Sequence, residues 1–292
     1  MASIDATTLA PAQGGWLARL TRHVRSVVGS NASRDIGAEL LLRPTKRDFE
    51  KSRIVYSTEF QMFLAIADPS RYNGFRKDAE QPPIEDHLSS LARLFVRYGV
   101  EKDFCVHLLH NHSKIERGKV AVGKSHEQPR GRYTRRVKIR NLDPSTVHGH
   151  VFALGEDGNL HPSEFQDGRI PDSFMVNRVF LAEFVKYLEI NDLGKVLGLE
   201  VIDQPYHSEM TEIEINDGTI MTVMMEARLL KGCSPYRQTS WRFEDMDGIP
   251  RVCKDGTQSH GTGPNGHITS QSKFVRPESF ECVWQQVQKE LC

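Results

Sequence analysis

The sequence lacks several features that would assign a chain of 292 residues to a familiar class. Lys and Arg together number 38, and so do Asp and Glu, so there is no excess of charge of either sign. Proteins that bind nucleic acid or an anionic membrane through their overall charge carry a basic excess, and neither partner is expected here. No apolar run approaches the roughly 20 residues that a membrane-spanning helix needs, so no membrane span is expected.

Cysteine is scarce, and several catalytic motifs are missing. The 5 cysteines are widely spaced and form no Cys-x-x-Cys pair, so a disulfide framework is not expected in a chain of this length. The sequence contains neither Gly-x-Ser-x-Gly nor Gly-x-Gly-x-x-Gly, which argues against an α/β-hydrolase and a dinucleotide-binding domain. His-Glu-x-x-His is also missing. A reduced, cytoplasmic protein is the default expectation.

Residues 1–30 carry an amphipathic pattern. Apolar residues recur at helical spacing between positions 16 and 28, with arginines on the opposite side. Asp5 is the one acidic residue in this stretch, a composition that also occurs in mitochondrial targeting segments. The pattern predicts a basic amphipathic helix or arm that packs on the domain or on a partner, with mitochondrial targeting as the less favoured interpretation.

Residues 31–292 are expected to form a single α+β domain. Apolar periodicity predicts helices over residues 84–98, 172–188 and 278–291. Alternating patterns predict strands and one clear hairpin, over residues 104–112, 119–122, 134–141, 145–154, 160–165, 211–215 and 219–230. The region 232–272 is rich in Gly, Ser, Thr, Asp and Pro and is predicted to form long loops. Hairpins between helices, without regular βαβ alternation, favour a mainly antiparallel sheet with packed helices.

Two patterns are typical of anion binding, but each has a simpler interpretation. Residues 118–125 match Gly-x-x-x-x-Gly-Lys-[Ser/Thr] at every position. The Val-Ala-Val interior is strand-like, however, and residues 126–131 are a poor start for a helix, so we interpret the match as a strand that ends in a turn. Residues 130–140 contain six Lys and Arg, which we interpret as an exposed edge ribbon instead of a phosphate or carboxylate clamp.

Histidine is the residue with the most uneven distribution. Of the 12 histidines, six lie between His107 and His150. His110 and His112 would share one face of a strand over residues 104–112, because successive side chains of a strand point to opposite faces. His148 and His150 would share a face of the strand over residues 145–154 in the same way. If these strands are neighbours, four imidazoles come together.

Four clustered imidazoles support more than one role. They can serve as general acid and base near neutral pH, they can bind a divalent metal, or they can be hydrogen-bonded structural side chains. The candidate catalytic residues are His110, His112, His148 and His150. Trp241 and Arg242 are candidate substrate-binding residues. No metal ligand is assigned and no cofactor is expected, although a divalent metal stays open as an alternative.

Two weaker groups of polar residues lie outside the histidine window. An acidic stretch precedes the predicted hairpin and could either orient a histidine or be surface charge, and it comprises Asp203, Glu209, Glu212 and Glu214. Potential zinc ligands lie in the loop-rich C-terminal region, and they are Cys253, His260, His267 and Cys282. Their spacing fits no compact zinc-binding pattern, so the second group is a weak signal.

The middle of the chain resembles an uncharacterised group of fungal proteins. The resemblance is carried by residues 106–112, 119–122 and 158–165, where the group has a His-x-His strand and a Gly-x-Leu-x-Pro-x-Glu-aromatic segment. It implies an accessory or tailoring protein of fungal specialised metabolism. Some enzymes in that setting are cofactor-free cyclases that shape a reactive polyene in an apolar pocket.

The leading expectation is therefore an enzyme of the isomerase or cyclase type. It would act on a small, largely apolar molecule in a pocket between the sheet and its helices, with acid/base or hydrogen-bond assistance from histidine. One alternative is a metal-dependent, His-ligated oxygenase or hydrolase. Another is a non-enzymatic ligand-binding or scaffold protein whose N-terminal helix docks a partner. The sequence predicts neither the substrate nor the oligomeric state.

Overall fold

Strand pairing dominates the part of the chain that the computed structural model describes, which is residues 52–55, 67–128, 130–169, 177–203, 208–215, 220–230, 234–253, 258–263, 266–267 and 280–291. In chain order the elements are α5 (Pro69–Asn73), the 3-10 helix η1 (Asp78–Glu80), α6 (Glu85–Tyr98), β1 (Phe104–Leu108), β2 (Lys119–Glu127), β3 (Arg130–Lys138), η2 (Ile139–Asn141), β4 (Val147–Leu154), β5 (Leu160–Asp167), α7 (Arg178–Ile190), β6 (Leu197–Val201), β7 (Met210–Glu214), β8 (Ile220–Glu226), η4 (Ala227–Leu229), β9 (Ser234–Trp241), β10 (Phe243–Met246), β11 (Ile249–Val252), β12 (Gln258–Gly263), β13 (Gly266–His267) and α8 (Phe280–Leu291). The helix or arm predicted for residues 1–30 lies outside the described residues.

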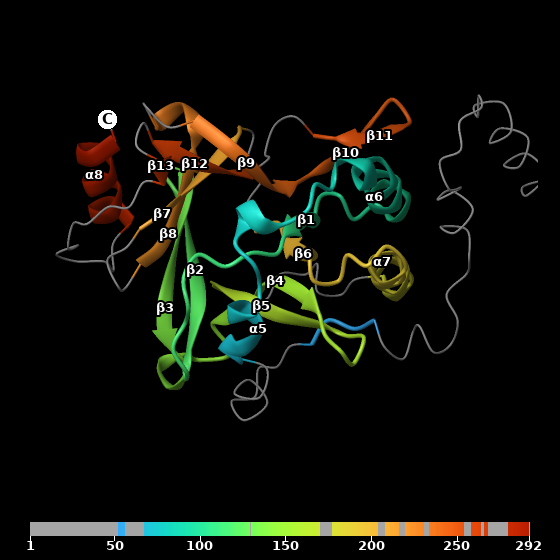
Figure 1. Cartoon of the computed structure of the whole chain (residues 1–292), viewed down its shortest axis with the longest axis horizontal. Coiled ribbons are helices and arrows are strands. Elements are labelled where there is room, and N and C mark those ends of the chain that lie inside the picture. The colour runs from blue at the N-terminus through green and yellow to red at the C-terminus, as the bar shows by residue number, and fades with distance from the viewer. Residues whose placement is uncertain are drawn as a thin grey trace, which may run out of the picture. The chain divides into compact units, whose positions relative to one another are not determined.

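The main sheet closes on itself. Its strand order is β13-β12-β7-β8-β3-β2-β5-β4-β6-β1-β9, and β9 also pairs with β12, so ten strands form a closed barrel (Figure 1). Neighbouring strands in the barrel are antiparallel except for β2 with β5 and β7 with β12, which are parallel. Strand β13 continues from β12 outside the ring, and β10 and β11 form a separate hairpin.

The expected α+β architecture, with helices packed on a mainly antiparallel open sheet, is therefore wrong. The error arises in residues 232–272, which are predicted to be loops but contain β9 to β13, including both strands of the closure. Strand β12 has the sequence Gln-Ser-His-Gly-Thr-Gly, so it shows no apolar alternation at all. Its first three side chains are nevertheless buried: Gln258 and His260 contact the interior carboxylates Glu200 and Glu212, and Ser259 contacts Glu209.

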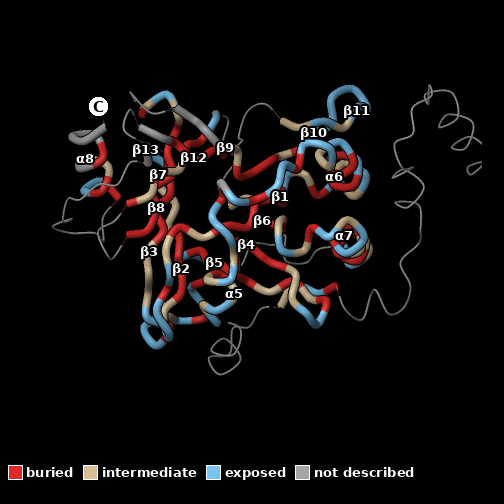
Figure 2. The backbone as a smooth tube through the Cα atoms, in the orientation of Figure 1, coloured by how far each residue is buried: buried red, intermediate tan, exposed pale blue. Residues whose placement is uncertain are grey.

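Polar side chains occupy the interior of the barrel, and apolar ones face the helices. On β1, Phe104 packs toward Phe180 of α7, with 6.3 Å between ring centroids, whereas His107 points inward and contacts Glu200. Both faces of several strands are therefore covered. Figure 2 shows the result, since β4, β6 and β8 are buried along almost their whole length.

Helices α6 and α7 cover one flank of the barrel through aromatic contacts. The ring of Phe95 lies 5.0 Å from Phe180, 5.8 Å from Phe184 and 5.0 Å from Phe243 of β10, measured between centroids. Helix α6 confirms the helix predicted over residues 84–98. It ends at Gly99, whose φ of 64° lies in the left-handed region that favours glycine.

Helix α8 covers a different flank (Figure 1) and confirms the helix predicted near the C-terminus. Phe280 at its start stacks on His126, with 4.3 Å between ring centroids. Phe280, Val283 and Val287 join an apolar cluster with Tyr133 of β3 and residues of β7 and β8. No helix among the described residues is long and apolar enough to cross a membrane.

The strands of the barrel include the segments that resemble a phosphate loop and a basic edge ribbon in the sequence. The predicted hairpin is confirmed as β7–β8, and the strands predicted over residues 145–154 and 160–165 pair antiparallel as β4 and β5. Residues 119–127 form β2, so most of the phosphate-loop match lies in a strand. The basic segment 130–140 is not an edge, because β3 pairs with both β2 and β8. Within it, Arg132 is buried and lies 3.6 Å from Glu164.

Replacement of Phe95 by alanine is expected to lower the free energy of unfolding by about 3–5 kcal/mol, because it removes a fully buried ring that joins α6, α7 and β10. Urea denaturation followed by circular dichroism would measure the loss. Ile249→Ala is the control, since the Ile249 side chain is 66% exposed and its loss should change stability by less than about 0.5 kcal/mol. Equal effects of the two substitutions would contradict the packing described for α6.

Candidate metal centre

The four histidines predicted to form one site lie in two separate groups. Strand β6 lies between β1 and β4 in the sheet, so the two His-x-His segments are not on neighbouring strands. Strand β1 ends at Leu108, and His110 and His112 follow it instead of lying within a strand over residues 104–112. His148 and His150 are on β4, as predicted. All four are buried, so the histidine-rich region is an interior feature of the barrel.

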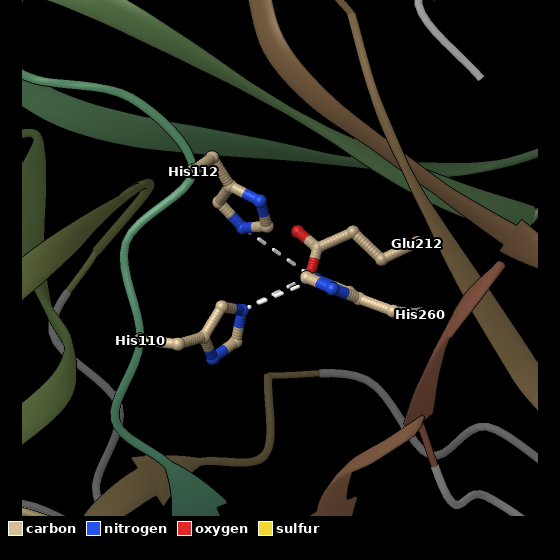
Figure 3. A group of neighbouring side chains, drawn as sticks. All are labelled: His110, His112, Glu212 and His260. Atoms are coloured by element: carbon tan, nitrogen blue, oxygen red, sulfur yellow. Dashed lines mark hydrogen bonds and ion pairs between the residues drawn. The ribbon is translucent and has the colours of Figure 1, made fainter. Parts of the chain in front are cut away.

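The first group contains His110 and His112 together with two residues from distant parts of the chain, Glu212 of β7 and His260 of β12 (Figure 3). One nitrogen or oxygen from each of the four side chains lies within 4.8 Å of all the others. Nε2 of His260 is 3.1 Å from Nε2 of His110 and 3.1 Å from Oε2 of Glu212. The same carboxylate oxygen is 3.6 Å from Nε2 of His112 and 3.9 Å from Nε2 of His110.

These separations match the edges of a metal coordination shell. Ligand atoms at about 2.1 Å from one ion are about 3.0 Å apart at octahedral right angles and about 3.4 Å apart in a tetrahedron. Four of the six separations, from 3.1 to 3.9 Å, bracket the tetrahedral value, and the other two, both of which involve His112, are within 4.8 Å. Three imidazoles and one carboxylate are ligands that first-row divalent metals accept. The four side chains can therefore hold such an ion after small adjustments.

Hydrogen bonds outside the group orient two of the imidazoles. Nδ1 of His110 donates to the backbone oxygen of Leu108 at 2.6 Å, and Nδ1 of His260 donates to Oδ2 of Asp78 at 2.9 Å. Each ring therefore turns its Nε2 toward the centre of the group. Metal-binding histidines usually make such a second hydrogen bond, which sets the tautomer and the orientation of the ring.

Residues 72–81 hold the segment that follows β1. The backbone nitrogen of Asn111 donates to the oxygen of Arg76 at 3.1 Å, and that of His112 donates to the Tyr72 hydroxyl at 3.0 Å. The ammonium of Lys77 also donates to the backbone oxygen of His112. These bonds fix a non-regular backbone in place, so the two histidines both reach the interior without belonging to a strand.

Strand register brings the other two residues together. On the parallel pair β7 and β12, Glu212 lies directly opposite His260. The pairing of β12 with β9 is irregular between Gln258 and Ser259 and again between His260 and Gly261. Such irregularities re-aim side chains near functional sites, and here they flank the histidine that faces the group.

The group strongly perturbs the protonation of its members. Burial lowers the pKa of His112 to about 3. Burial also opposes the charged form of His260, but its hydrogen bonds to Asp78 and Glu212 outweigh that cost and raise its pKa to about 9. Burial would raise the pKa of the Glu212 carboxyl, yet the neighbouring His112 and His260 hold it well below its usual range. In the metal-free group, therefore, His260 is the favoured carrier of positive charge, next to the negatively charged carboxylate of Glu212.

A cavity of about 320 Å³ adjoins the group. Three of the four potential ligands line it, and His110 is the one that does not. Its other lining residues are Lys77, Asp78, Glu80, Asn111, Glu214 and Gly261. This volume lies at the lower end of the range for small-molecule sites.

The second group is built around the buried carboxylate of Glu200 on β6. It accepts hydrogen bonds from His107 at 3.0 Å, Ser240 at 2.9 Å and Gln258 at 2.8 Å. Nε2 of His150 lies 3.3 Å from one of its oxygens. The donors come from β1, β9, β12 and β4, so one side chain connects four strands across the interior.

Asp203 continues this group toward β4. Its carboxylate oxygens lie 3.0 Å from Nε2 of His148 and 2.9 Å from Nδ1 of His150. Burial and the Arg132 guanidinium oppose protonation of His150, but the two carboxylates outweigh them and raise its pKa. Burial would raise the pKa of the Glu200 carboxyl, yet its contacts with His107 and His150 hold it well below 4.5. The group is a buried network of ion pairs.

The space beside this second group is small. It measures about 10 Å³, which is roughly the room that one water molecule needs. Arg242 lines it together with His150, Glu200 and Asp203. Trp241 is buried opposite Val106 in the pairing of β9 with β1, and it lines neither cavity described above. The two residues predicted to bind substrate are therefore placed apart from the larger cavity.

Sequence reasoning identifies half of the first group and leaves out the other half. Glu212 and His260 each appear in the weaker groups of polar residues, but nothing in the sequence joins them to His110 and His112. No sequence pattern singles out Asp78 or Glu200. A separation of 150 residues lies between His110 and His260, so only strand pairing reveals the contact.

Comparison of the chain with protein-family models, with curated proteins and with solved structures finds no match.

The second group predicts a pH dependence of stability. Because the pKa of His150 is raised in the folded chain, its contribution is complete below 6.5 and is lost as the pH rises through the raised value. The contribution of Glu200 is complete above 4.5 and is lost as the pH falls through its lowered pKa. We expect His150→Gln to lower the free energy of unfolding by about 3 kcal/mol near pH 5–6, and by less at higher pH.

Urea denaturation of both proteins in a chelator, at a series of pH values from about 5 to about 9, would measure this difference. The chelator removes any contribution from bound metal. A difference that stays constant over the whole pH series would contradict the charged pairing of His150.

Proposed function

We propose that this protein is a metal-dependent enzyme that binds one divalent transition-metal ion through His110, His112, Glu212 and His260. The ion would lie inside the barrel, at the wall of the larger cavity. A small molecule in that cavity would be the substrate. This choice takes up the metal-dependent oxygenase or hydrolase that the sequence leaves open as an alternative.

One observation carries the proposal. The rings of His110 and His260 each commit Nδ1 to an acceptor outside the group, so both Nε2 atoms face the same point as the Glu212 carboxylate. In the metal-free group a protonated His260 hydrogen-bonds through Nε2 to His110 and Glu212, and a divalent ion would take the place of that proton. A divalent ion at this point would compensate the carboxylate and accept the nitrogen lone pairs at once.

The ligand set favours a first-row transition metal. Imidazole suits zinc, iron, copper and nickel, while a site for magnesium or calcium would be built from oxygen atoms. A four-ligand set leaves one or two positions for exchangeable ligands when the ion is five- or six-coordinate. Since His112, Glu212 and His260 line the cavity and His110 does not, those positions would face the cavity.

A bound ion would supply Lewis acidity or, if redox-active, electron transfer. The chain's own residues hold the substrate beside it and keep the ligand rings oriented. Iron or copper in the purified protein would support an oxygenase, and zinc would support a hydrolase. The barrel shields the site from bulk water, which strengthens electrostatic interactions there.

The isomerase or cyclase activity expected from the sequence would use the same cavity, because the space beside His148 and His150 has room for about one water molecule. A role in fungal specialised metabolism, implied by the resemblance, stays a proposal as well. A cluster of biosynthetic genes around the coding gene would support it.

Metal content tests the proposed function directly. We expect the untagged protein to bind one equivalent of zinc per chain, measured by elemental analysis after dialysis. His110→Ala, Glu212→Ala and His260→Ala should each weaken zinc binding by more than about 100-fold, because each removes one of four ligands.

The matched control is His148→Ala, which removes a buried histidine of the other His-x-His segment and should leave the zinc content unchanged. Circular dichroism of each variant would show whether the fold is retained. Absence of stoichiometric metal from the folded protein after loading would refute the proposed function.

Asp78 should tune the affinity without acting as a ligand. Asp78→Asn keeps a hydrogen-bond acceptor for Nδ1 of His260 but removes the negative charge that supports the ring. We expect zinc affinity to fall by about 10- to 100-fold while the capacity stays at one equivalent. Competition with a chromogenic chelator would measure both quantities, and an unchanged affinity would show that Asp78 does not support the site.

A further inference from the structure

The cavity beside the candidate metal centre has an unusual lining. None of the described residues that line it carries an apolar side chain. Drug-sized ligand sites are lined mainly by hydrophobic and aromatic groups, with a few polar ones for orientation. A lining of this kind offers little to an apolar molecule and many partners to a polar one.

The described residues that line the cavity carry more carboxylates than ammonium groups. Asp78 is occupied by His260, and Glu212 belongs to the metal group, so a divalent ion would balance these two carboxylates. The other charged residues of the described lining are Lys77, Glu80 and Glu214, so carboxylates outnumber the ammonium group there by two to one. Among the described residues, neither Glu80 nor Glu214 forms an ion pair.

Lys77 is already engaged in a hydrogen bond. Its ammonium donates to the backbone oxygen of His112, which directs it to the chain segment that carries two of the ligands. Glu214 lies two positions after Glu212 on β7, so both side chains point to the same face of the strand. The Glu214 carboxylate therefore lies on the same wall of the cavity as the candidate metal ligand Glu212, where it can contact a molecule bound in the cavity.

We infer that the substrate is a small polar molecule with a cationic group, such as an amine or a guanidine, that binds the metal at one end and meets Glu80 and Glu214 at the other. This inference rests on the proposed function. It replaces the apolar substrate expected from the sequence by a class that these lining residues can bind.

A series of three hydroxamates tests the inference, because the hydroxamate group binds the metal in the same way in each. β-Alanine hydroxamate has a cationic tail, butyrohydroxamate a neutral tail and succinic monohydroxamate an anionic tail of similar length. Isothermal titration calorimetry on the zinc-loaded full chain would give their affinities. We expect the cationic compound to bind about tenfold more tightly than the neutral one, and the anionic compound to bind most weakly.

The variant Glu80→Gln with Glu214→Gln should bring the affinities of the cationic and neutral compounds to within about twofold, with the zinc content unchanged. Glu85→Gln with Glu189→Gln is the matched control, since it removes two exposed carboxylates from α6 and α7 and should preserve the preference. Any preference that survives the first pair, or disappears in the control pair, overturns the inference.

The two proposals fail in different ways. If the chain does not bind zinc, the proposed function fails and the inference fails with it. If zinc binds with one equivalent but the hydroxamates bind equally, bind in the opposite order or do not bind, the inference is wrong and the metal site stands.

Discussion

The pairing of β9 with β12 is the constraint on which the rest of the structure depends. Without it the ten strands would be an open sheet with two free edges, and the polar side chains of β12 would face water. With it the same side chains are enclosed, and each must find a partner because an unpaired buried polar group is costly. Glu200 meets this demand at the closure, since it accepts hydrogen bonds from Ser240 of β9 and Gln258 of β12.

Enclosure also explains why imidazoles and carboxylates alternate through the interior. From His148 the contacts run through Asp203, His150 and Glu200 to His107, whose ring stacks on His110 with 5.3 Å between centroids. Buried charges are tolerated when they are paired and hydrogen-bonded, and removal of one partner leaves the other uncompensated. The two groups are therefore parts of one polar interior, although only the first has ligand atoms that converge on a point and a cavity large enough for a small molecule.

Local features of the fold can be predicted from the sequence, and long-range ones cannot. Helix α6 shows apolar periodicity and a terminal Gly99, and the β7–β8 hairpin shows alternation around a turn, so the sequence predicts both. Strand β12 contains no apolar residue, so its sequence resembles a loop. Its polar side chains are suited to the polar interior of the barrel, which the sequence alone does not reveal. Once β12 is missed, the barrel cannot be inferred, and neither can the position of His260.

The same reasoning applies to the site. The clustering of histidines directs attention to His110 and His112, and all four predicted histidines are buried. The expectation that these two histidines lie in one group with His148 and His150 is not met, because β6 separates β1 from β4 in the sheet. Contact between Glu212 and His260 depends on the parallel register of β7 and β12, which no local pattern in the sequence encodes.

The late position of β12 in the chain has a consequence for biosynthesis. Residues up to 230 leave the ribosome with the first two histidines and the glutamate already present, but the fourth member of the group arrives only with His260. Until then the nascent sheet has two exposed edges, β7 on one side and β9 beside β1 on the other, a state that invites pairing with other chains. The metal site and the closed barrel are thus completed by the same late event, and a ribosome that stalls before codon 258 would release a chain that has neither.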